Sequence, residues 1–284
     1  MAFTKIQEYI STADGTAGTL LIPKLIMPNL IEEVDKNLLD RSLAAQTWGP
    51  NQIAGGTFTV NLETPNTMDV RVVGEGAEIP LDNIGFETVT YTPAKYGVAI
   101  RITKEMTEDS QFELFQRNIR IAGKRFAENE TNLVVGALDG ANSTVSGGAQ
   151  ITIANITSAM QNVEDEDYNP TDLIIGTEVL NDLRNIDVFV EANKAGDTTM
   201  LTTGMRGNIY GLNVHVVSPN FGSNASKTSA YVLDRTQTYG IAIKRDITVE
   251  TFNLPSFDME GAAITQRIDV QLLRSKAVSK ITTA

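Results

Sequence analysis

The most constraining feature of this sequence is a polar segment at residues 55–92 that is built from two alternating runs. Apolar residues in its first half recur at every second position: Phe58, Val60 and Leu62. A Thr-rich run at 86–92 repeats that period, and the period predicts two strands. Loop-forming residues at 74–80 lie between the runs, so we expect a long two-stranded hairpin. Because an isolated hairpin is marginally stable in water, this one must lie on another surface.

The amino-acid composition excludes several kinds of functional site. The 284 residues hold no cysteine and one histidine, His215, which excludes disulfides, thiolate zinc sites, iron–sulfur clusters and cysteine nucleophiles. The net charge of −12 argues against a protein that grips nucleic acid by its phosphates. A hydrophobic fraction of 42% and a charged fraction of 20% are typical of a globular protein of one or two domains.

Residues 1–45 are predicted to form an extended arm. Small and flexible residues come first, and an apolar segment broken by Pro23 and Pro28 follows. Residues 29–39 could form a short helix, and the arm's apolar residues require cover from either the chain's own core or a neighbouring subunit. We find no secretory signal, and the apolar segment is shorter than the roughly 20 residues that span a membrane. We therefore expect a soluble protein made in a cytoplasm.

The strongest helical pattern covers residues 111–139. Ser110 and Glu113 fit a capping box, and Gly140 supplies a stop signal. Such a helix would be about 43 Å long at 1.5 Å per residue. It carries four basic residues, namely Arg117, Arg120, Lys124 and Arg125, interleaved with the acidic Glu113, Glu128 and Glu130. We interpret this mixture as a solvated, charge-mixed helix face.

The second half of the chain alternates between helix and strand after a Gly/Ser/Asn loop at 140–148. The spacing of Ile153, Ile156, Met160 and Val163 predicts a short amphipathic helix. A compact buried strand is predicted at 172–176 and a helix at 178–185 with Thr177 as its cap. The remaining predicted strands are 212–217, 231–233, 240–243, 247–252 and 264–272.

We find no catalytic, cofactor-binding or metal-binding motif and predict that the protein is not an enzyme. His215 lies on the polar side of a strand, which favours a surface or interface histidine. The acidic run 164–167 starts like a calcium loop, but Pro170 occupies the position that needs glycine and Gly176 the position that needs a bidentate glutamate. We interpret the run as a solvated turn.

The order of these elements resembles that of the major capsid proteins of tailed double-stranded-DNA phages. The acidic loop 74–80 is similar to a segment of the family's E-loop, and 97–110 resembles the strand and turn that enter its long spine helix. Residues 173–176 followed by 179–184 are similar to a strand and helix of the axial domain. Residues 210–217 resemble a recurrent family strand in which Asn213 replaces proline. The resemblance implies an α+β, HK97-like major capsid fold.

The resemblance also implies a domain layout for the chain. The N-terminal arm would be 1–45, the E-loop hairpin 46–98, the peripheral domain with its spine helix 99–144 and 226–284, and the axial domain 145–225. The family's E-loop lies over a neighbouring subunit. We expect Arg71, Glu75 and Glu78 to form charge pairs across that overlap, between copies of the chain.

The implied function is a structural one. Copies would assemble in the host cytoplasm into hexamers and pentamers of the icosahedral virion capsid, which encloses double-stranded DNA without sequence-specific binding and without a membrane. An acidic wall that repels phosphate suits this role. Implied partners are a portal and a scaffold, expected as a separate protein because the sequence enters the arm at once. Whether a decoration protein binds outside is left open.

Covalent linkage between subunits is not expected. Some family members join an E-loop lysine to a distant asparagine, but residues 51–94 contain no lysine here. The alternative within the fold is an encapsulin-type nanocompartment shell, which loads a cargo enzyme instead of DNA. An α/β enzyme is a weaker alternative because the sequence lacks a catalytic constellation.

Overall fold

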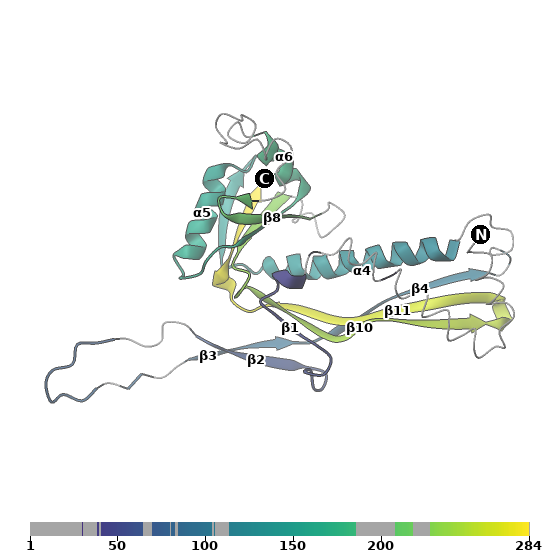
Figure 1. Ribbon diagram of the computed structural model, residues 1–284, viewed down its shortest axis with the longest axis horizontal. Coiled ribbons are helices and arrows are strands. Elements are labelled where there is room, and N and C mark those ends of the chain that lie inside the picture. Colours follow the sequence, from purple (N-terminus) through teal and green to yellow (C-terminus); the bar gives the residue numbers. More distant parts are fainter. Residues whose placement is uncertain are drawn as a thin grey trace.

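The computed structural model contains two sheets, the helices that cover them and a separate two-stranded hairpin (Figure 1). The residues it describes are 30, 39, 41–64, 70–79, 81–82, 85–103, 105, 114–185, 208–217 and 228–283. Most of the arm expected at 1–45, including the helix predicted at 29–39, lies outside these residues. No helix among the described residues is both long enough and apolar enough to cross a membrane.

The first sheet has four strands in the order β1-β10-β11-β4. Their bounds are Gln46–Trp48 for β1, Tyr239–Leu254 for β10, Met259–Leu272 for β11 and Ala94–Thr103 for β4. Strands β10 and β11 form an antiparallel hairpin that ends in the 3-10 helix η2 (Pro255–Phe257). Strand β4 is antiparallel to β11, whereas β1 is parallel to β10. The short helix η1 (Arg41–Leu43) precedes β1.

Helix α4 (Leu114–Leu138) lies along one face of this sheet (Figure 1). A cluster of buried apolar side chains from the helix and the strands includes Ile100, Ile119, Ala122, Phe126 and Ile264. The helical residues recur at every third or fourth position, which places them on one side of the helix. The helix predicted at 111–139 is therefore confirmed from 114 onward. The predicted capping box at Ser110 and Glu113 lies outside the described residues.

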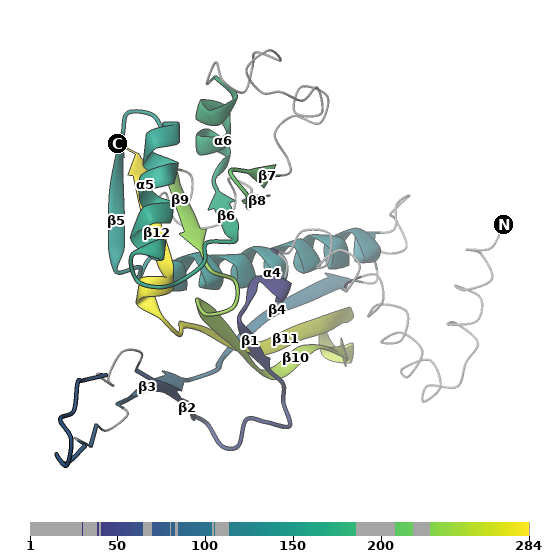
Figure 2. The same ribbon diagram turned by 60° about the vertical axis from the view of Figure 1, so that its left-hand side comes forward.

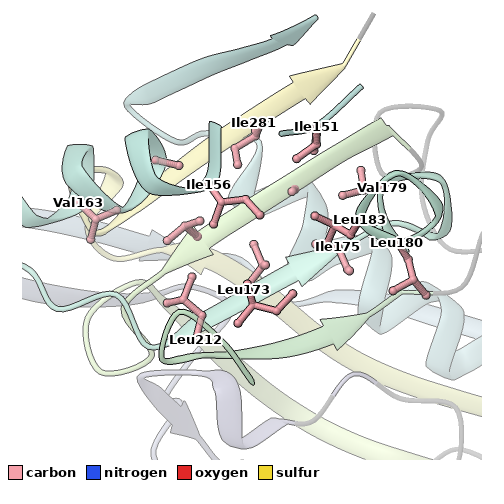
Figure 3. Packing of buried hydrophobic residues seen from close by; sticks show 14 residues of the cluster. Ile151, Ile156, Val163, Leu173, Ile175, Val179, Leu180, Leu183, Leu212 and Ile281 are labelled. Carbon is pink, nitrogen blue, oxygen red and sulfur yellow. The ribbon is translucent and has the colours of Figure 1, made fainter. Parts of the chain in front are cut away.

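The second sheet has six strands in the order β5-β12-β9-β6-β8-β7. Their bounds are Ser143–Gly148 for β5, Val278–Thr283 for β12, Ser229–Leu233 for β9, Asp172–Ile175 for β6, Leu212–Val216 for β8 and Asn208–Ile209 for β7. Helices α5 (Ile153–Glu164) and α6 (Thr177–Arg184) pack on it. Their apolar sides meet the sheet in one buried cluster, in which Ile156, Leu173 and Leu183 lie close together (Figure 3).

Three local predictions need correction. The loop predicted at 140–148 contains strand β5, a polar edge strand that pairs with β12. The cap of α6 is Gly176, and Thr177 is the first helical residue. The strands predicted at 240–243 and 247–252 form one continuous strand, β10. At the polar residues between them, β10 stays paired with β11 but its register with β11 shifts.

The division predicted at residue 226 does not coincide with the division between the sheets. Strands β9 and β12 belong to 226–284, which was expected to be entirely peripheral, yet both pair within the six-stranded sheet. All five residues of β9 are buried between neighbouring strands β6 and β12, which explains its place there. Only β10 and β11 of this segment join the four-stranded sheet.

Among the described elements the chain crosses between the two sheet units three times, from α4 to β5, from β9 to β10 and from β11 to β12. The 3-10 helix η3 (Ser275–Ala277) lies in the last crossing. The Asp139 carboxylate accepts hydrogen bonds from the Tyr231 hydroxyl at 2.6 Å and the Lys280 ammonium at 2.7 Å. Burial and the Asp139 carboxylate raise the pKa of the Tyr231 hydroxyl. This network joins the end of α4 to two strands of the other unit.

Candidate functional site

The hairpin of β2 (Phe58–Glu63) and β3 (Phe86–Tyr91) projects from the body of the molecule (Figures 1 and 2). Its two strands are antiparallel, in a register that runs from the pair Phe58 and Tyr91 to the pair Glu63 and Phe86. Both strands were predicted from their alternating pattern, and that prediction is confirmed. The pattern arises because one side of β2 is half-buried at the hairpin's base and the other side faces solvent.

The loop beyond the strands exposes large apolar side chains. Val70 and Val72 are fully exposed, and Leu81 is 93% exposed. Ile79 and Phe86 are also mostly exposed. Single exposed apolar residues are common on protein surfaces, but a contiguous group of them marks an interaction surface. The described loop residues 70–79 and 81–82 therefore form the strongest candidate functional site of the chain.

The base of the hairpin, in contrast, is packed firmly against the four-stranded sheet. Trp48, Phe58 and Tyr91 form an aromatic cluster with ring centroids 5.1 to 6.1 Å apart. Gly240 of β10 lies beneath them, and a Cβ atom there would come within 2.5 Å of the Trp48 ring and 2.6 Å of the Tyr91 hydroxyl. Burial raises the pKa of Tyr91 above its ordinary value. Only glycine allows the aromatic rings to approach the sheet this closely.

Polar contacts also fasten this base. The Lys244 ammonium donates to the carbonyls of Ile53 at 2.8 Å and Gly55 at 2.7 Å. The backbone N–H of Thr92 donates to the Asp269 carboxylate at 2.6 Å. Two guanidinium groups donate to backbone carbonyls: Arg274 to that of Glu63, the last residue of β2, and Arg267 to that of Pro93, between β3 and β4. The hairpin is thus anchored where it leaves the body.

The three residues predicted to contact a neighbour all lie in the exposed loop. Arg71 pairs with Asp82 across the loop, with guanidinium nitrogen and carboxylate oxygen 3.4 Å apart. Glu75 and Glu78 are exposed: Glu75 lies within a turn closed by a bond from the Ala77 N–H to the Gly74 carbonyl, and Glu78 follows that turn. Sequence analysis missed Asp82, although it is the acidic residue nearest to the end of the loop.

Helix α4 differs from the charge-mixed face that the sequence indicated. The carboxylate of Glu130 is buried and accepts two hydrogen bonds from Arg41, at 2.6 and 2.8 Å, and a third from Gln266 at 3.3 Å. The Glu128 side chain is also buried, and its carboxylate lies 2.6 Å from the Arg125 guanidinium. Glu130 therefore pairs with a residue outside the helix, whereas Glu128 pairs with the exposed Arg125 of the helix itself. The sequence could not indicate this, because Arg41 lies 89 residues from Glu130.

His215 belongs to a cluster around a buried carboxylate. Its Nε2 atom lies 2.9 Å from Asp172, whose side chain is fully buried, while 25% of the histidine side chain is exposed. The Arg235 guanidinium lies 3.0 Å from the same oxygen, and the Thr171 hydroxyl donates at 2.7 Å. Burial alone would raise the pKa of Asp172, but the hydrogen bonds from Thr171, His215 and Arg235 and the charge of Arg235 outweigh it and lower the pKa. The cluster connects β6, β8 and the turn after β9.

No catalytic or metal arrangement emerges around these groups. Among the described residues no three His, Asp or Glu side chains are grouped so that they could hold a metal ion. The acidic run 164–167 forms the turn that was predicted between α5 and β6, and Lys276 pairs with Glu166 there at 2.8 Å.

Comparison with known proteins identifies the architecture. The fold matches a solved structure from Microbacterium phage Oxtober96 with a TM-score of 0.64 and 16% identity, covering 86% of this chain and 90% of that one. A subunit of the bacteriophage PhiM1 mature capsid matches with a TM-score of 0.67 and 11% identity over 87% of each chain. A virus-like particle from Pyrococcus furiosus matches with a TM-score of 0.60 and 13% identity, over 89% of this chain and 96% of that one.

These likenesses define the class of protein, since the chain has the HK97-like capsid fold that its order of elements predicted. A sequence model described as phage capsid protein matches residues 86–281. The chain therefore belongs to the phage capsid protein family, and its role in the capsid is structural. A search of curated protein sequences found no significant match.

Proposed function

We propose that this protein is the major capsid protein of a tailed phage and assembles into the hexamers and pentamers of an icosahedral head. The observation that carries the proposal is the anchored hairpin with an uncovered apolar loop. Val70, Val72 and Leu81 are displayed at the end of a strand pair that the molecule itself fixes in direction. Family membership and the fold support the same function.

The proposed shell gives each part of the chain a role. Residues 46–98 form the E-loop and lie over a neighbouring copy, where Arg71, Glu75 and Glu78 make charge pairs. The axial domain comprises 145–225 together with β9 and β12 and meets its copies around the local symmetry axis. The four-stranded sheet and α4 form the peripheral domain. Residues 1–45 form the arm.

The proposed shell encloses double-stranded DNA. Because the chain has a net charge of −12, it repels the phosphates of DNA and does not bind them nonspecifically. The packed DNA therefore stays mobile for ejection. The portal and a separate scaffolding protein are the proposed partners during assembly in the host cytoplasm, and any decoration protein would bind the outer surface. The protein resides in the virion and catalyses no reaction.

Electron microscopy of the purified protein, expressed with and without its scaffold, tests this proposal. Closed shells with hexamers and pentamers support a phage head, whereas small uniform shells that carry a cargo protein would support the encapsulin alternative. Discrete monomers or dimers under all conditions would contradict both. Boiling in SDS is expected to release a single band of 30.8 kDa, and a ladder of covalent oligomers would contradict noncovalent assembly.

A further inference from the structure

The core between α4 and the four-stranded sheet consists of two apolar clusters that follow each other along the helix. One cluster includes Ile119, Ala122, Phe126 and Ala127 of α4 with Ile247 of β10 and Ile264 of β11. The other includes Val134, Val135 and Leu138 of α4 with Ile241, Ile243, Ile268 and Val270 of the same two strands. Tyr96 of β4 packs against both clusters. The core of this unit is therefore divided along the axis of α4.

Polar residues separate the two clusters on three elements at once. On α4, Glu130 lies between the apolar residues of the two clusters, and only 2% of it is exposed. On β11, the fully buried Gln266 occupies the corresponding place between them. On β10, residues 244–246 lie between the clusters, where the register with β11 shifts. We call Glu130, Gln266 and their shared partner Arg41 the polar layer.

The polar layer connects the helix to the sheet at one level. Its acceptor is the Glu130 carboxylate on α4, which is bonded by Arg41 at 2.6 and 2.8 Å and by Gln266 at 3.3 Å. Gln266 belongs to β11, and Arg41 lies in η1, shortly before β1 of the same sheet. The Arg41 guanidinium also lies 3.8 Å from the carboxylate of Asp246 on β10. Both donors to Glu130 are therefore positioned by the sheet and not by the helix.

Stability alone does not explain the polar layer. A buried ion pair loses its hydration, and apolar residues of similar volume in its place often leave a protein equally or more stable. The layer is also incompletely satisfied, because the Oε1 atom of Gln266 is buried and has no hydrogen-bond partner among the described residues. A role in positioning remains, since hydrophobic attraction is non-directional and does not by itself define one position of α4 along the sheet.

The hydrogen bonds of the polar layer, in contrast, are formed at one position of the helix only. A shift of α4 by one turn moves Glu130 by about 5.4 Å along the helix axis. The shift separates the carboxylate from both donors and brings it towards one of the apolar clusters. A buried carboxylate without a partner is strongly unfavourable. The layer therefore excludes shifted positions that the apolar clusters alone would tolerate.

We propose that Arg41, Glu130 and Gln266 are positioning residues that fix the register of α4 on the four-stranded sheet. The register also affects the other sheet unit, because Asp139 directly follows α4 and accepts the hydrogen bonds that join the helix to β9 and β12. A shifted helix would displace these bonds and change the arrangement of the two units. The inference rests on the proposed function, because a closed shell requires copies in which that arrangement is defined.

An apolar replacement of the layer tests the proposal. The triple variant Arg41→Met, Glu130→Met and Gln266→Met should unfold at the same urea concentration as the unaltered subunit or at a higher one. Because the chain lacks cysteine, nitroxide labels at Lys124→Cys on α4 and Thr47→Cys on β1, both exposed positions, report the register by pulsed EPR. We expect one narrow distance distribution in the otherwise unaltered chain. The triple variant should add a second population displaced by about 5 Å.

Two further variants separate positioning from stability. Glu130→Gln keeps a polar group that can accept from Arg41, so it should keep a single distance, although it should unfold at a lower urea concentration because the charge of the acceptor is lost. The matched control replaces the exposed ion pair of Lys276 and Glu166 with methionines and should change neither the distance nor the stability. The polar variant thus loses stability and keeps the register, whereas the apolar variant does the reverse.

Each outcome decides the proposal. The second population should reach at least about one tenth of the first, which corresponds to a difference between registers of at most about 1.4 kcal/mol. A triple variant with one unchanged distance would overturn the positioning role. A triple variant that fails to fold would overturn it as well, because the layer would then be required for stability. Failure of the unaltered protein to form shells with its scaffold would contradict the capsid function, while the distances in the subunit would still decide the register.

Discussion

The six-stranded sheet and the β2–β3 hairpin have the same kind of backbone pairing but differ in how far their strands are buried. In the sheet, strands β6 and β9 are buried along their full length between α5, α6 and neighbouring strands. In the hairpin, β3 is exposed at four of its six positions and only Tyr91 is buried. Hydrogen bonding alone therefore does not decide where a strand pair finds its stability. The sheet unit contains its own core, whereas most described residues of β3 and of the loop beyond it remain exposed.

The largest expected effect is on the six-stranded sheet, whose core is formed within one chain. Leu173→Ala removes a fully buried side chain from the cluster shown in Figure 3 and should lower the free energy of unfolding by about 2–5 kcal/mol. Urea denaturation of the dissociated subunit measures this value. The matched control is Leu81→Ala in the loop, which should cost less than about 0.5 kcal/mol. Equal losses in the two variants would contradict the difference between the regions.

The next effect concerns the junction between hairpin and body. Gly240→Ala places a methyl group against Trp48 and Tyr91 and should destabilise the subunit by about 1–3 kcal/mol through overpacking. The fluorescence of Trp48, the single tryptophan, should change at the same time. Gly56→Ala is a suitable control because a Cβ atom there meets nothing within 4 Å. An unperturbed tryptophan spectrum in Gly240→Ala would argue against a rigid base.

The buried carboxylate of the sheet unit predicts a dependence on pH. Because the pKa of Asp172 is lower in the folded protein than its ordinary value of 3.8, its stabilising contribution is present above that value and lost as pH falls below it. Asp172→Asn should cost about 1–3 kcal/mol at neutral pH, because the partners of the carboxylate lose its charge. Unfolding measured from pH 7 to pH 3 should then show a weaker acid dependence than in the unaltered protein. The exposed Asp165→Asn should leave the profile unchanged.

The smallest effect on subunit stability is expected from the exposed loop that we propose contacts a neighbouring copy. Val70→Ser combined with Val72→Ser should change the free energy of unfolding by less than about 0.5 kcal/mol, because both side chains are fully exposed. The same variant should fail to form closed shells in electron micrographs. Normal shells from this variant would show that the loop's apolar residues do not contribute to the interface.

Sequence periodicity predicted those helices and strands in which regularly spaced apolar residues form the buried side. Helix α5 and strands β2, β3 and β6 follow directly from the spacing of their apolar residues. Strand β5 was missed because Val145 is its only large apolar residue, and its partner β12 lies at the other end of the chain. Long-range pairing of this kind leaves no local signal.

The candidate site was less accessible to sequence analysis than the fold. The contacts of Arg71, Glu75 and Glu78 with a neighbouring copy stay a prediction, and the sequence could not show that Arg71 pairs with Asp82. The burial of Glu128 and Glu130 changes the charge of α4, and it depends on partners that only the folded chain brings near. The charge of a helix's exposed face can therefore be read from the sequence only when it is known which of its carboxylates are buried.

The three crossings between the sheet units have a mechanical consequence. A tensile force that separates the two units is carried by three segments of chain in parallel, and the bonds of Asp139 to Tyr231 and Lys280 join the same region. Each segment then bears only part of the force. A chain connected in this way resists separation of its two sheet units without depending on a single connecting segment.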